Sequence, residues 1–278
     1  MLDALAALSK ALLYAGLLTS AGAAFAAATL RAPDALNAGT TRAIRRGAIL
    51  TIAAVVTGGL VLIYRLGGAF DDATLSAVFV SSSGASMGLQ LAGAALLLAA
   101  TADPTPTHGT KVTNAALMTL SFAFTGHAGA MSVTDGLIAS LHVSAAAWWV
   151  GSLWCLWWAC TQTSTAELAQ LVRRFGTLAT GLVGGLVIAG LVLVLVLVKL
   201  EQLPALSAYE ILLALKICAA LSAVAIAAYN RVRLTPRLLA GDTGTAMMLR
   251  RTITAELVVI GVVIAVTAVL TTYTSPHE

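Results

Sequence analysis

Long apolar runs separated by short polar segments fill almost the whole chain. Eight such runs lie at about 5–29, 48–66, 82–101, 112–131, 136–160, 174–198, 208–228 and 251–273. An α-helix needs about 20 apolar residues to cross the hydrocarbon core of a bilayer. The pattern therefore predicts an all-α integral membrane protein, built as a bundle of about eight transmembrane helices. The third run is the least regular, because serines and a glycine at 81–84 interrupt its start.

Composition leads to the same class of protein. Hydrophobic residues make up 59% of the chain and charged residues only 10%, whereas an average soluble domain has about 25% charged residues. The connecting segments are too short to hold a separate soluble domain. We therefore expect residues 1–278 to form a single polytopic membrane domain. The first run follows Met1-Leu2-Asp3, which has no basic residue, so we expect it to be retained as a helix and not cleaved as a signal peptide.

The basic residues gather in every second loop. If the N-terminus faces outward, the inner loops hold 12 of the 16 basic residues, because the outer side keeps only Lys10, Arg65, Lys199 and Lys216. An excess of Lys and Arg marks cytoplasmic loops. We therefore expect both termini to face outward, together with the turn at 132–135. This bias also explains the formal charge of +4 without a nucleic-acid partner.

Two histidines lie inside predicted spans, at matched distances from one turn. His127 and His142 flank the polar turn Ser132-Val133-Thr134-Asp135, each roughly 7–8 residues from its centre, which places both about 11 Å down their helices. An ionisable residue within a spanning helix indicates a functional site, because an unpartnered polar group there is costly. We expect the two imidazoles to face each other as a ligand pair. The alternative is a structural hydrogen bond between helices, worth about 1 kcal/mol.

Further potential ligands lie near the same outer end. Met131 follows His127 by four residues, on the same helical face and closer to the surface. Asp135 in the turn is a harder ligand or attracts cations, unless it is simply a solvated turn residue. Met87, near the start of the third run, belongs to the same outer half. The other two histidines, His108 in a proline-rich inner loop and His277 near the C-terminus, are expected to be solvated.

Four other side chains are candidates for a pathway through the bundle, namely Lys216, Glu256, Cys155 and Cys218. Lys216 lies in the outer third of the seventh run and Glu256 in the inner third of the eighth, about 15 Å apart in depth, so we expect no direct ion pair between them. Lys216 can extend outward along its stem. Glu256 is expected either to pair with Arg250 or Arg251, or to act as an exit ligand or proton acceptor.

The cysteines and small residues have simpler interpretations. The chain has three cysteines without CxxC spacing, so no disulfide framework or zinc site is predicted. Cys155 and Cys218 would join a pathway only if their helices touch. Glycines are expected to allow close helix approach at Gly58-Gly59, Gly181, Gly184-Gly185 and Gly190. Trp154, Trp157 and Trp158 are expected to form an inner interfacial belt.

Several short motifs, in order, resemble one family of bacterial inner-membrane proteins. They are Phe124-Thr125-Gly126-His127-Ala128, the segment Leu141-His142-Val143-Ser144-Ala145-Ala146-Ala147-Trp148-Trp149-Val150-Gly151-Ser152-Leu153, Arg173-Arg174-Phe175-Gly176, Tyr209, Lys216, Tyr229-Asn230-Arg231 through Pro236, Leu249-Arg250-Arg251, and Glu256-Leu257. From about residue 112 to the end, the chain resembles the copper resistance protein D (CopD) family. Where that family often shows two glycines, this chain has Gly151-Ser152.

The resemblance implies a copper-binding transporter or permease in the inner membrane, with both termini periplasmic and no enzymatic activity. Copper, as Cu(I) or Cu(II), would enter from the periplasm through His127 and His142. A separate periplasmic copper-binding protein of the CopC type is the implied partner, beside membrane lipids. Imidazole and thioether ligands both suit copper. The sequence has no P-loop and no Asp-Lys-Thr-Gly motif, so ATP is not expected to drive transport.

Two alternatives remain open at this point. His127 and His142 could be the axial ligands of one b-type haem in an electron-transfer protein, since bis-histidine ligation between helices is chemically reasonable. The chain could also be a non-transporting membrane partner of a periplasmic copper protein, with no metal site of its own.

Overall fold

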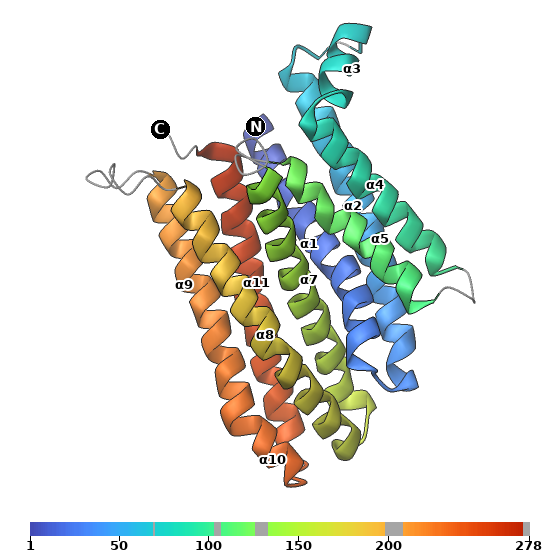
Figure 1. Cartoon of the computed structure of the whole chain (residues 1–278), viewed down its shortest axis with the longest axis vertical. Helices are drawn as coiled ribbons and strands as arrows, with labels where there is room; N and C mark the ends of the chain where they lie inside the picture. The colour runs from blue at the N-terminus through green and yellow to red at the C-terminus, as the bar shows by residue number, and fades with distance from the viewer. Residues whose placement is uncertain (69, 103–106, 126–132, 198–207, 275–278) are drawn as a thin grey trace.

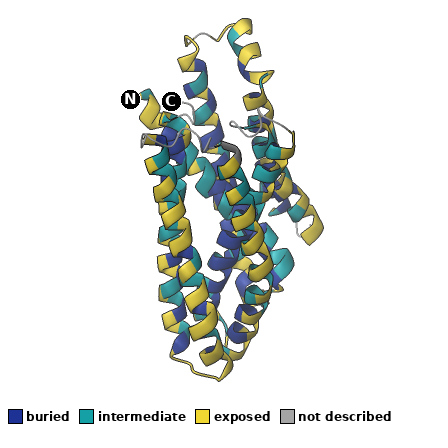
Figure 2. Ribbon diagram, turned by 60° about the vertical axis from the view of Figure 1, so that its left-hand side comes forward, coloured by how far each residue is buried: buried dark blue, intermediate teal, exposed yellow. Residues whose placement is uncertain are grey.

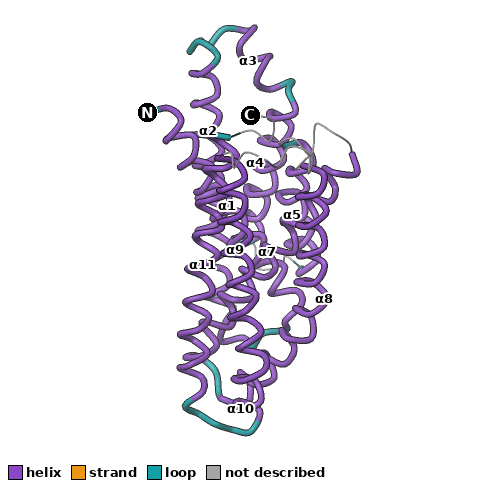
Figure 3. Tube along the Cα trace, turned by 90° about the vertical axis from the view of Figure 1, so that its left-hand side faces the viewer, coloured by secondary structure: helices purple, strands orange, loops and turns teal. Residues whose placement is uncertain are grey.

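Seven helices of the described chain are long and apolar enough to cross a membrane. In the computed structural model they are α1 (Leu2–Leu30), α2 (Asn37–Arg65), α4 (Ser82–Ala100), α7 (Val133–Gln162), α8 (Thr165–Leu197), α9 (Ala208–Tyr229) and α11 (Thr245–Tyr273). The structure describes residues 1–68, 70–102, 107–125, 133–197 and 208–274. Each long helix corresponds to one predicted run, which confirms an all-helical, multi-pass membrane protein. Figure 3 shows helix along almost the whole described trace.

Shorter helices connect the long ones or extend them. They are η1 (Asp34–Leu36), α3 (Asp72–Phe79), α5 (His108–Leu120), η2 (Ser121–Phe124), the π-helix η4 (Asn230–Leu234) and α10 (Thr235–Leu239). The fourth predicted span, 112–131, corresponds to α5 and η2 followed by residues outside the described ranges. Figure 1 shows α5 running back toward the end of the bundle that holds both termini. The count of eight crossings stays a prediction.

The two ends of the bundle differ in charge. In Figure 1 both termini lie at one end of the bundle, and the helix ends at the opposite end hold the basic residues predicted for inner loops. These residues are Arg31, Arg42, Arg45, Arg46, Lys111, Arg173, Arg174, Arg231, Arg233, Arg237, Arg250 and Arg251. Arg65 lies toward the other end and pairs with Asp3. The fold thus brings together at one end basic residues that are scattered along the sequence.

α1 and α7 are the central helices, because both contribute to the two buried cores. One core joins them to α2, α4 and α5, and the other joins them to α8, α9 and α11. Where α1 and α7 cross, a Cβ atom on Gly22 would overlap the Ala147 carbonyl, and one on Gly151 would overlap the Gly22 backbone. α1 meets α2 in the same way, because a Cβ on Gly16 would lie 2.8 Å from the Gly47 carbonyl oxygen.

Most of the glycines singled out from the sequence do not mark these crossings. No described atom lies within 4 Å of a Cβ built on Gly181, Gly184 or Gly185, so the prediction of close approach was wrong there. Gly59 and Gly190 do make close contacts, but with the side chains of Met87 and His142. The reason is that the fully buried positions of α8 lie in its first turns, while later residues such as Val183 and Leu186 are only partly buried against the core. Its buried residues are Leu168, Ala169, Leu171 and Val172, and none is buried between 173 and 195.

The outer faces of α8 and α9 are apolar and exposed. Figure 2 shows exposed positions along much of the bundle surface, and those of α8 and α9 include Leu182, Val187, Ile188, Leu191, Leu195, Ile211, Leu215 and Leu221. An apolar surface of this extent is costly in water and matches lipid tails. α8 packs closely on α7, and α9 packs closely on α11, whereas α8 and α9 are not closely packed together in the described part.

Adding a single methyl group at the central crossing should destabilise the fold. Gly22→Ala places a Cβ against the α7 backbone, and we expect a loss of about 1–3 kcal/mol, typical of overpacking. Gly184→Ala, which meets open space, is the matched control. It should be neutral or stabilising by up to about 1 kcal/mol through helix propensity. Thermal unfolding of the detergent-purified proteins compares the two. Equal melting temperatures for both variants would contradict a tight α1–α7 contact.

Candidate functional site

One face of α7 carries three polar groups at regular spacing. Asp135, His142 and Trp149 follow each other at seven-residue intervals, which is nearly two helical turns, so they lie along one side of the helix. Successive members are about 10 Å apart along the axis. This face looks toward the helices of the C-terminal half, because His142 contacts α8 and Trp149 contacts α11. It forms a polar stripe inside an otherwise apolar set of helices.

The imidazole of His142 lies against the backbone of α8. Its Nδ1 is 3.2 Å from the carbonyl oxygen of Leu186, and its Cε1 would lie 3.2 Å from a Cβ on Gly190. A side chain at 190 would crowd the ring, which would then have to shift by a few tenths of an ångström. Because a carbonyl oxygen can only accept, Nδ1 carries the hydrogen, and the lone pair of the neutral ring is then on Nε2. Histidine metal ligands are commonly oriented by such a second hydrogen bond.

The charge of Lys216 on α9 acts on this ring. Lys216 is half-buried and near enough to His142 for an electrostatic interaction with it. The imidazole thus contacts α8 and lies within electrostatic reach of a charge on α9. A positive side chain beside a potential metal ligand opposes permanent retention of a cation.

Glu256 of α11 is fully buried, and two side chains hold its carboxylate. The indole Nε1 of Trp149 donates to Oε1 at 2.8 Å, and the amide Nδ2 of Asn230 donates to Oε2 at 3.4 Å. The predicted pairing of Glu256 with Arg250 or Arg251 is not what the structure shows. These arginines precede Glu256 by six and five residues, which places both more than 100° around the helix. Arg250 instead stacks over the Trp157 ring, 4.0 Å from its centroid.

Asn230 opens the π-helix that ends α9. The wider turn is closed by the amide and hydroxyl of Thr235, which both donate to the Asn230 carbonyl. The side-chain oxygen Oδ1 of Asn230 is buried and has no hydrogen-bond partner in the described part. π-turns occur mostly as local bulges, frequently at functional sites. Here the π-turn lies where Asn230 meets Glu256.

A second cluster connects α7, α8 and the end of α1. The Trp148 indole donates to the Thr29 hydroxyl at 2.8 Å, and its ring stacks on Phe175 with centroids 5.6 Å apart. Nε of Arg174 donates to the Thr29 carbonyl at 2.8 Å. That carbonyl belongs to the last turn of α1, where carbonyls have no partner within the helix. Arg174 and Phe175 of the Arg-Arg-Phe motif thus hold α8 onto α1 and α7.

The remaining tryptophans also make contacts between helices, and the interfacial belt expected from the sequence stays a prediction. Trp154 meets Trp157 and Trp158 with ring centroids 6.0 and 6.1 Å apart. Trp157 donates to Thr254, and Trp158 lies against Gly39 of α2. The expectation of an interfacial belt missed these contacts, which join α7 to α11 and α2.

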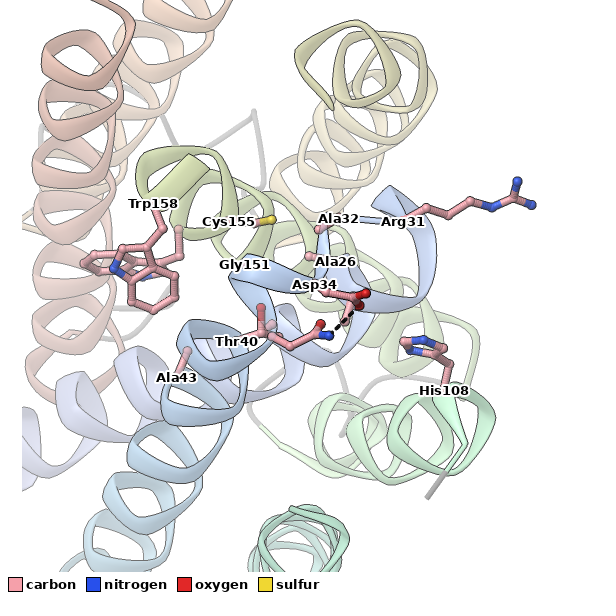
Figure 4. A pocket seen from close by; sticks show the side chains of 14 residues that line it. Ala26, Arg31, Ala32, Asp34, Thr40, Ala43, His108, Gly151, Cys155 and Trp158 are labelled. Atoms are coloured by element: carbon pink, nitrogen blue, oxygen red, sulfur yellow. Dashed lines mark hydrogen bonds between the residues drawn. The ribbon is translucent and has the colours of Figure 1, made fainter. Parts of the chain in front are cut away.

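A small hollow lies at the basic end, between α1, η1, α2, the start of α5 and α7. It encloses about 130 Å³ and is lined by Cys155 together with Asp34, Asn37, Thr40 and His108. Figure 4 shows the Cys155 sulfur and the His108 ring in its wall, with Arg31 extending away. Cys155 is buried, whereas Cys218 is exposed on α9. The structure therefore does not bring these two thiols into a common site.

Other predicted ligands lie apart from His142 or outside the described ranges. The side chain of Met87 packs against Gly59 of α2, away from the α8 contact of His142. Asp135 lies in the first turn of α7. His127 and Met131 lie outside the described residues, so the pairing of His127 with His142 stays a prediction. Among the described residues, no three His, Cys, Asp or Glu side chains are grouped to hold a metal ion. A site with three such ligands around His142 therefore requires residues outside the described ranges.

Sequence reasoning missed the connection between α7 and Glu256. The signal was present, because Trp149 follows His142 by seven residues and so shares its face. The partner of Trp149 could not be found from spacing, since it lies 107 positions away in the chain.

Removing the indole donor should destabilise the buried carboxylate. Trp149→Phe leaves Oε1 of Glu256 without its partner, and we expect a loss of about 1–3 kcal/mol. Trp154→Phe, whose indole has ring contacts but no hydrogen bond in the described part, is the control and should cost less. In a Glu256→Leu background the cost of Trp149→Phe should shrink, because no buried acceptor remains. Thermal unfolding compares these four variants with the wild type, and an unchanged cost of Trp149→Phe in the Glu256→Leu background would rule out the contact.

The C-terminal half matches a known family model. Residues 169–270, from the first turns of α8 to the last turn of α11, match the model of copper resistance protein D. Neither the curated proteins nor the solved structures include a significant match to the chain. Glu256, Asn230 and Lys216 lie inside the matched segment, while His142 and Trp149 precede it. The matched segment is less than half of the chain, and it supports membership of the copper resistance protein D family.

Proposed function

We propose that the chain is a copper permease of the bacterial inner membrane that moves copper from the periplasm to the cytoplasm. The observation that carries this proposal is the fully buried Glu256, which accepts a hydrogen bond from Trp149. Trp149 lies on the same face of α7 as His142. Glu256 lies within the segment that matches the copper resistance family. Ionisable groups placed inside a bundle are typical of ion pathways. Copper resistance is a property of the family, and the direction and route of movement belong to this proposal.

The outer ligand is His142, with His127 as its partner. The hydrogen bond from Nδ1 to the Leu186 carbonyl leaves Nε2 to bind copper. Met131 and Asp135 would lie at the mouth of this site, where a thioether suits Cu(I) and a carboxylate attracts cations. Met87 and Cys218 are left out of the pathway, because Met87 packs on α2 and Cys218 is exposed. Cys155 has no role in the proposed copper pathway.

The stripe on α7 gives the copper ion a direction of movement. Two turns below His142, the carboxyl group of Glu256 is the next potential ligand, about 10 Å further toward the basic end. It serves as the inner ligand or as the proton acceptor that exchanges with copper. Lys216 weakens binding at His142, which suits a site that must release its cargo, since conduction requires binding weak enough to leave.

The energy would come from the copper gradient, the membrane potential or protons, because the sequence has no nucleotide-binding motif. In this proposal the chain binds and moves copper and performs no chemical conversion, so it is not an enzyme. A separate periplasmic copper protein of the CopC type would deliver the ion. The match to a copper resistance family gives no support to the haem alternative.

Loss of the two histidines should abolish copper binding and uptake. We expect wild-type protein in detergent to bind about one copper per chain, and His127→Ala/His142→Ala to lose at least tenfold in affinity, because both imidazole ligands are gone. His108→Ala, at the opposite end of the bundle, is the matched control and should bind like the wild type. Metal analysis with an absorption spectrum, followed by copper accumulation in cells, provides the measurements.

Each outcome of this experiment separates one alternative. A Soret band that disappears in the double variant would replace copper transport with haem-based electron transfer. Copper binding and accumulation that survive in the double variant would overturn the histidine site. A wild-type protein that binds no copper alone, yet binds a periplasmic copper protein, would favour the non-transporting partner.

The proposed orientation has its own test. In a cysteine-free background, Ser76→Cys on α3 and Thr243→Cys between α10 and α11 place exposed thiols at opposite ends. A membrane-impermeant maleimide should label Ser76→Cys in intact spheroplasts and Thr243→Cys only after permeabilisation. The reverse labelling pattern would place the basic end outside and contradict the orientation.

A further inference from the structure

A groove of about 600 Å³ lies at the basic end, between the end of α1 and the first turns of α8. Three arginines line it, Arg31 from α1 and Arg173 and Arg174 from α8. The rest of the lining is Leu30, Pro33, Glu167, Gln170, Leu171, Thr177 and Leu178. The groove is separate from the His142 and Glu256 groups.

The three guanidinium groups have no acidic partner in the described part of the chain. In the described part of the chain, the ion pair is the one between Arg65 and Asp3, at the opposite end of the bundle. Glu167 is the one acidic side chain on the α8 side of the groove, and Oε2 already accepts from the amide and hydroxyl of Ser164 at 2.9 and 2.7 Å. With three arginines and the one carboxylate of Glu167 in its lining, the groove keeps a net positive charge.

The arginines are held in different ways, and two of them are exposed. Nε of Arg174 donates to the Thr29 carbonyl, which fixes its guanidinium at the edge of the groove. Arg31 has a left-handed backbone, with φ 48° and ψ 52°, and is the one non-glycine residue with positive φ among those described. Such a conformation is unfavourable for a residue with a side chain. Figure 4 shows the Arg31 side chain leaving the hollow beside it, toward the outside of the helices.

The position of the groove relative to the apolar runs identifies its ligand. The apolar run of α1 ends at Leu30, just before Arg31, and the apolar run of α8 begins at Phe175, just after Arg174. Both helices therefore leave the hydrocarbon at this level, where lipid phosphates lie. Leu171 and Leu178 add apolar lining for an acyl chain. Basic pockets of this kind between membrane helices suit anionic lipid headgroups.

We propose that this groove binds the phosphate of one anionic phospholipid, with Arg31, Arg173 and Arg174 around the headgroup and an acyl chain along Leu171 and Leu178. Guanidinium groups recognise phosphate oxygens through paired N–H donors. The bound lipid would lie beside the Arg174–Thr29 contact, and so would stabilise the attachment of α8 to α1. Free phosphate shares the headgroup chemistry but lacks the acyl chain.

The test compares two variants that lose the same charge at the same end. Arg31→Gln/Arg173→Gln removes the two exposed groove arginines and spares Arg174, which serves the fold. Arg45→Gln/Arg46→Gln, on the exposed surface of α2, is the control. Native mass spectrometry of the full chain in detergent, titrated with dioleoyl phosphatidylglycerol, gives the apparent affinity. Dioleoyl phosphatidylcholine and inorganic phosphate are titrated in parallel.

We expect the groove variant to bind phosphatidylglycerol at least tenfold more weakly, since each surface arginine contributes about fivefold. The control variant should stay within about twofold of the wild type, and phosphatidylcholine should bind weakly to all three. Equal losses in both variants would show diffuse attraction to charge and overturn the site. Displacement of the lipid by millimolar inorganic phosphate would overturn the assignment to a lipid.

Discussion

The contact between the backbones of α1 and α7 is the constraint on which the rest of the structure depends. At Gly22 and Gly151 the two helices approach so closely that neither position has space for a Cβ atom. Both buried cores are built on this pair, one on each side. In a membrane, helices gain little from hydrophobic burial against each other, so packing at small residues has to hold them together. A crossing of this kind fixes the rotation of α7, and thereby decides which neighbours His142 and Trp149 meet.

Much of the fold could be predicted from the sequence, since apolar length and loop charge are local signals. Seven predicted spans correspond to long helices, and the basic residues gather at one end. Contacts between helices depend on rotation, which a run of Ala, Leu and Val does not reveal. Gly181, Gly184 and Gly185 therefore looked like packing positions, although they face open space. For the site, His142, Lys216 and Glu256 could be singled out because charge is rare in these helices. Their partners, Leu186 and Trp149 among them, could not.

The motifs that resemble the copper resistance family contain residues with different structural roles. The segments Trp148-Trp149 and Arg173-Arg174-Phe175 carried the resemblance to the copper resistance family, and the structure gives them separate tasks. Trp148, Arg174 and Phe175 meet around Thr29 and dock helices, whereas Trp149 turns toward the buried carboxylate of Glu256. Adjacent tryptophans on a helix point about 100° apart. A pair of them can therefore join α7 to two different neighbours within one turn.

The π-turn at Asn230 has a consequence for how this protein can vary among its relatives. A π-turn closes its hydrogen bond over one residue more than an α-turn, so it holds one extra residue in the same length of helix. Deleting that residue would restore an ordinary helix of about the same length, but would turn the residues of the π-turn itself toward other neighbours. Arg231, which now reaches the Gly176 carbonyl and the Thr180 hydroxyl of α8, would lose that alignment. Evolution is thus free to change the apolar residues of α9 one at a time, while its length at this point is held by the fit of three helices at once.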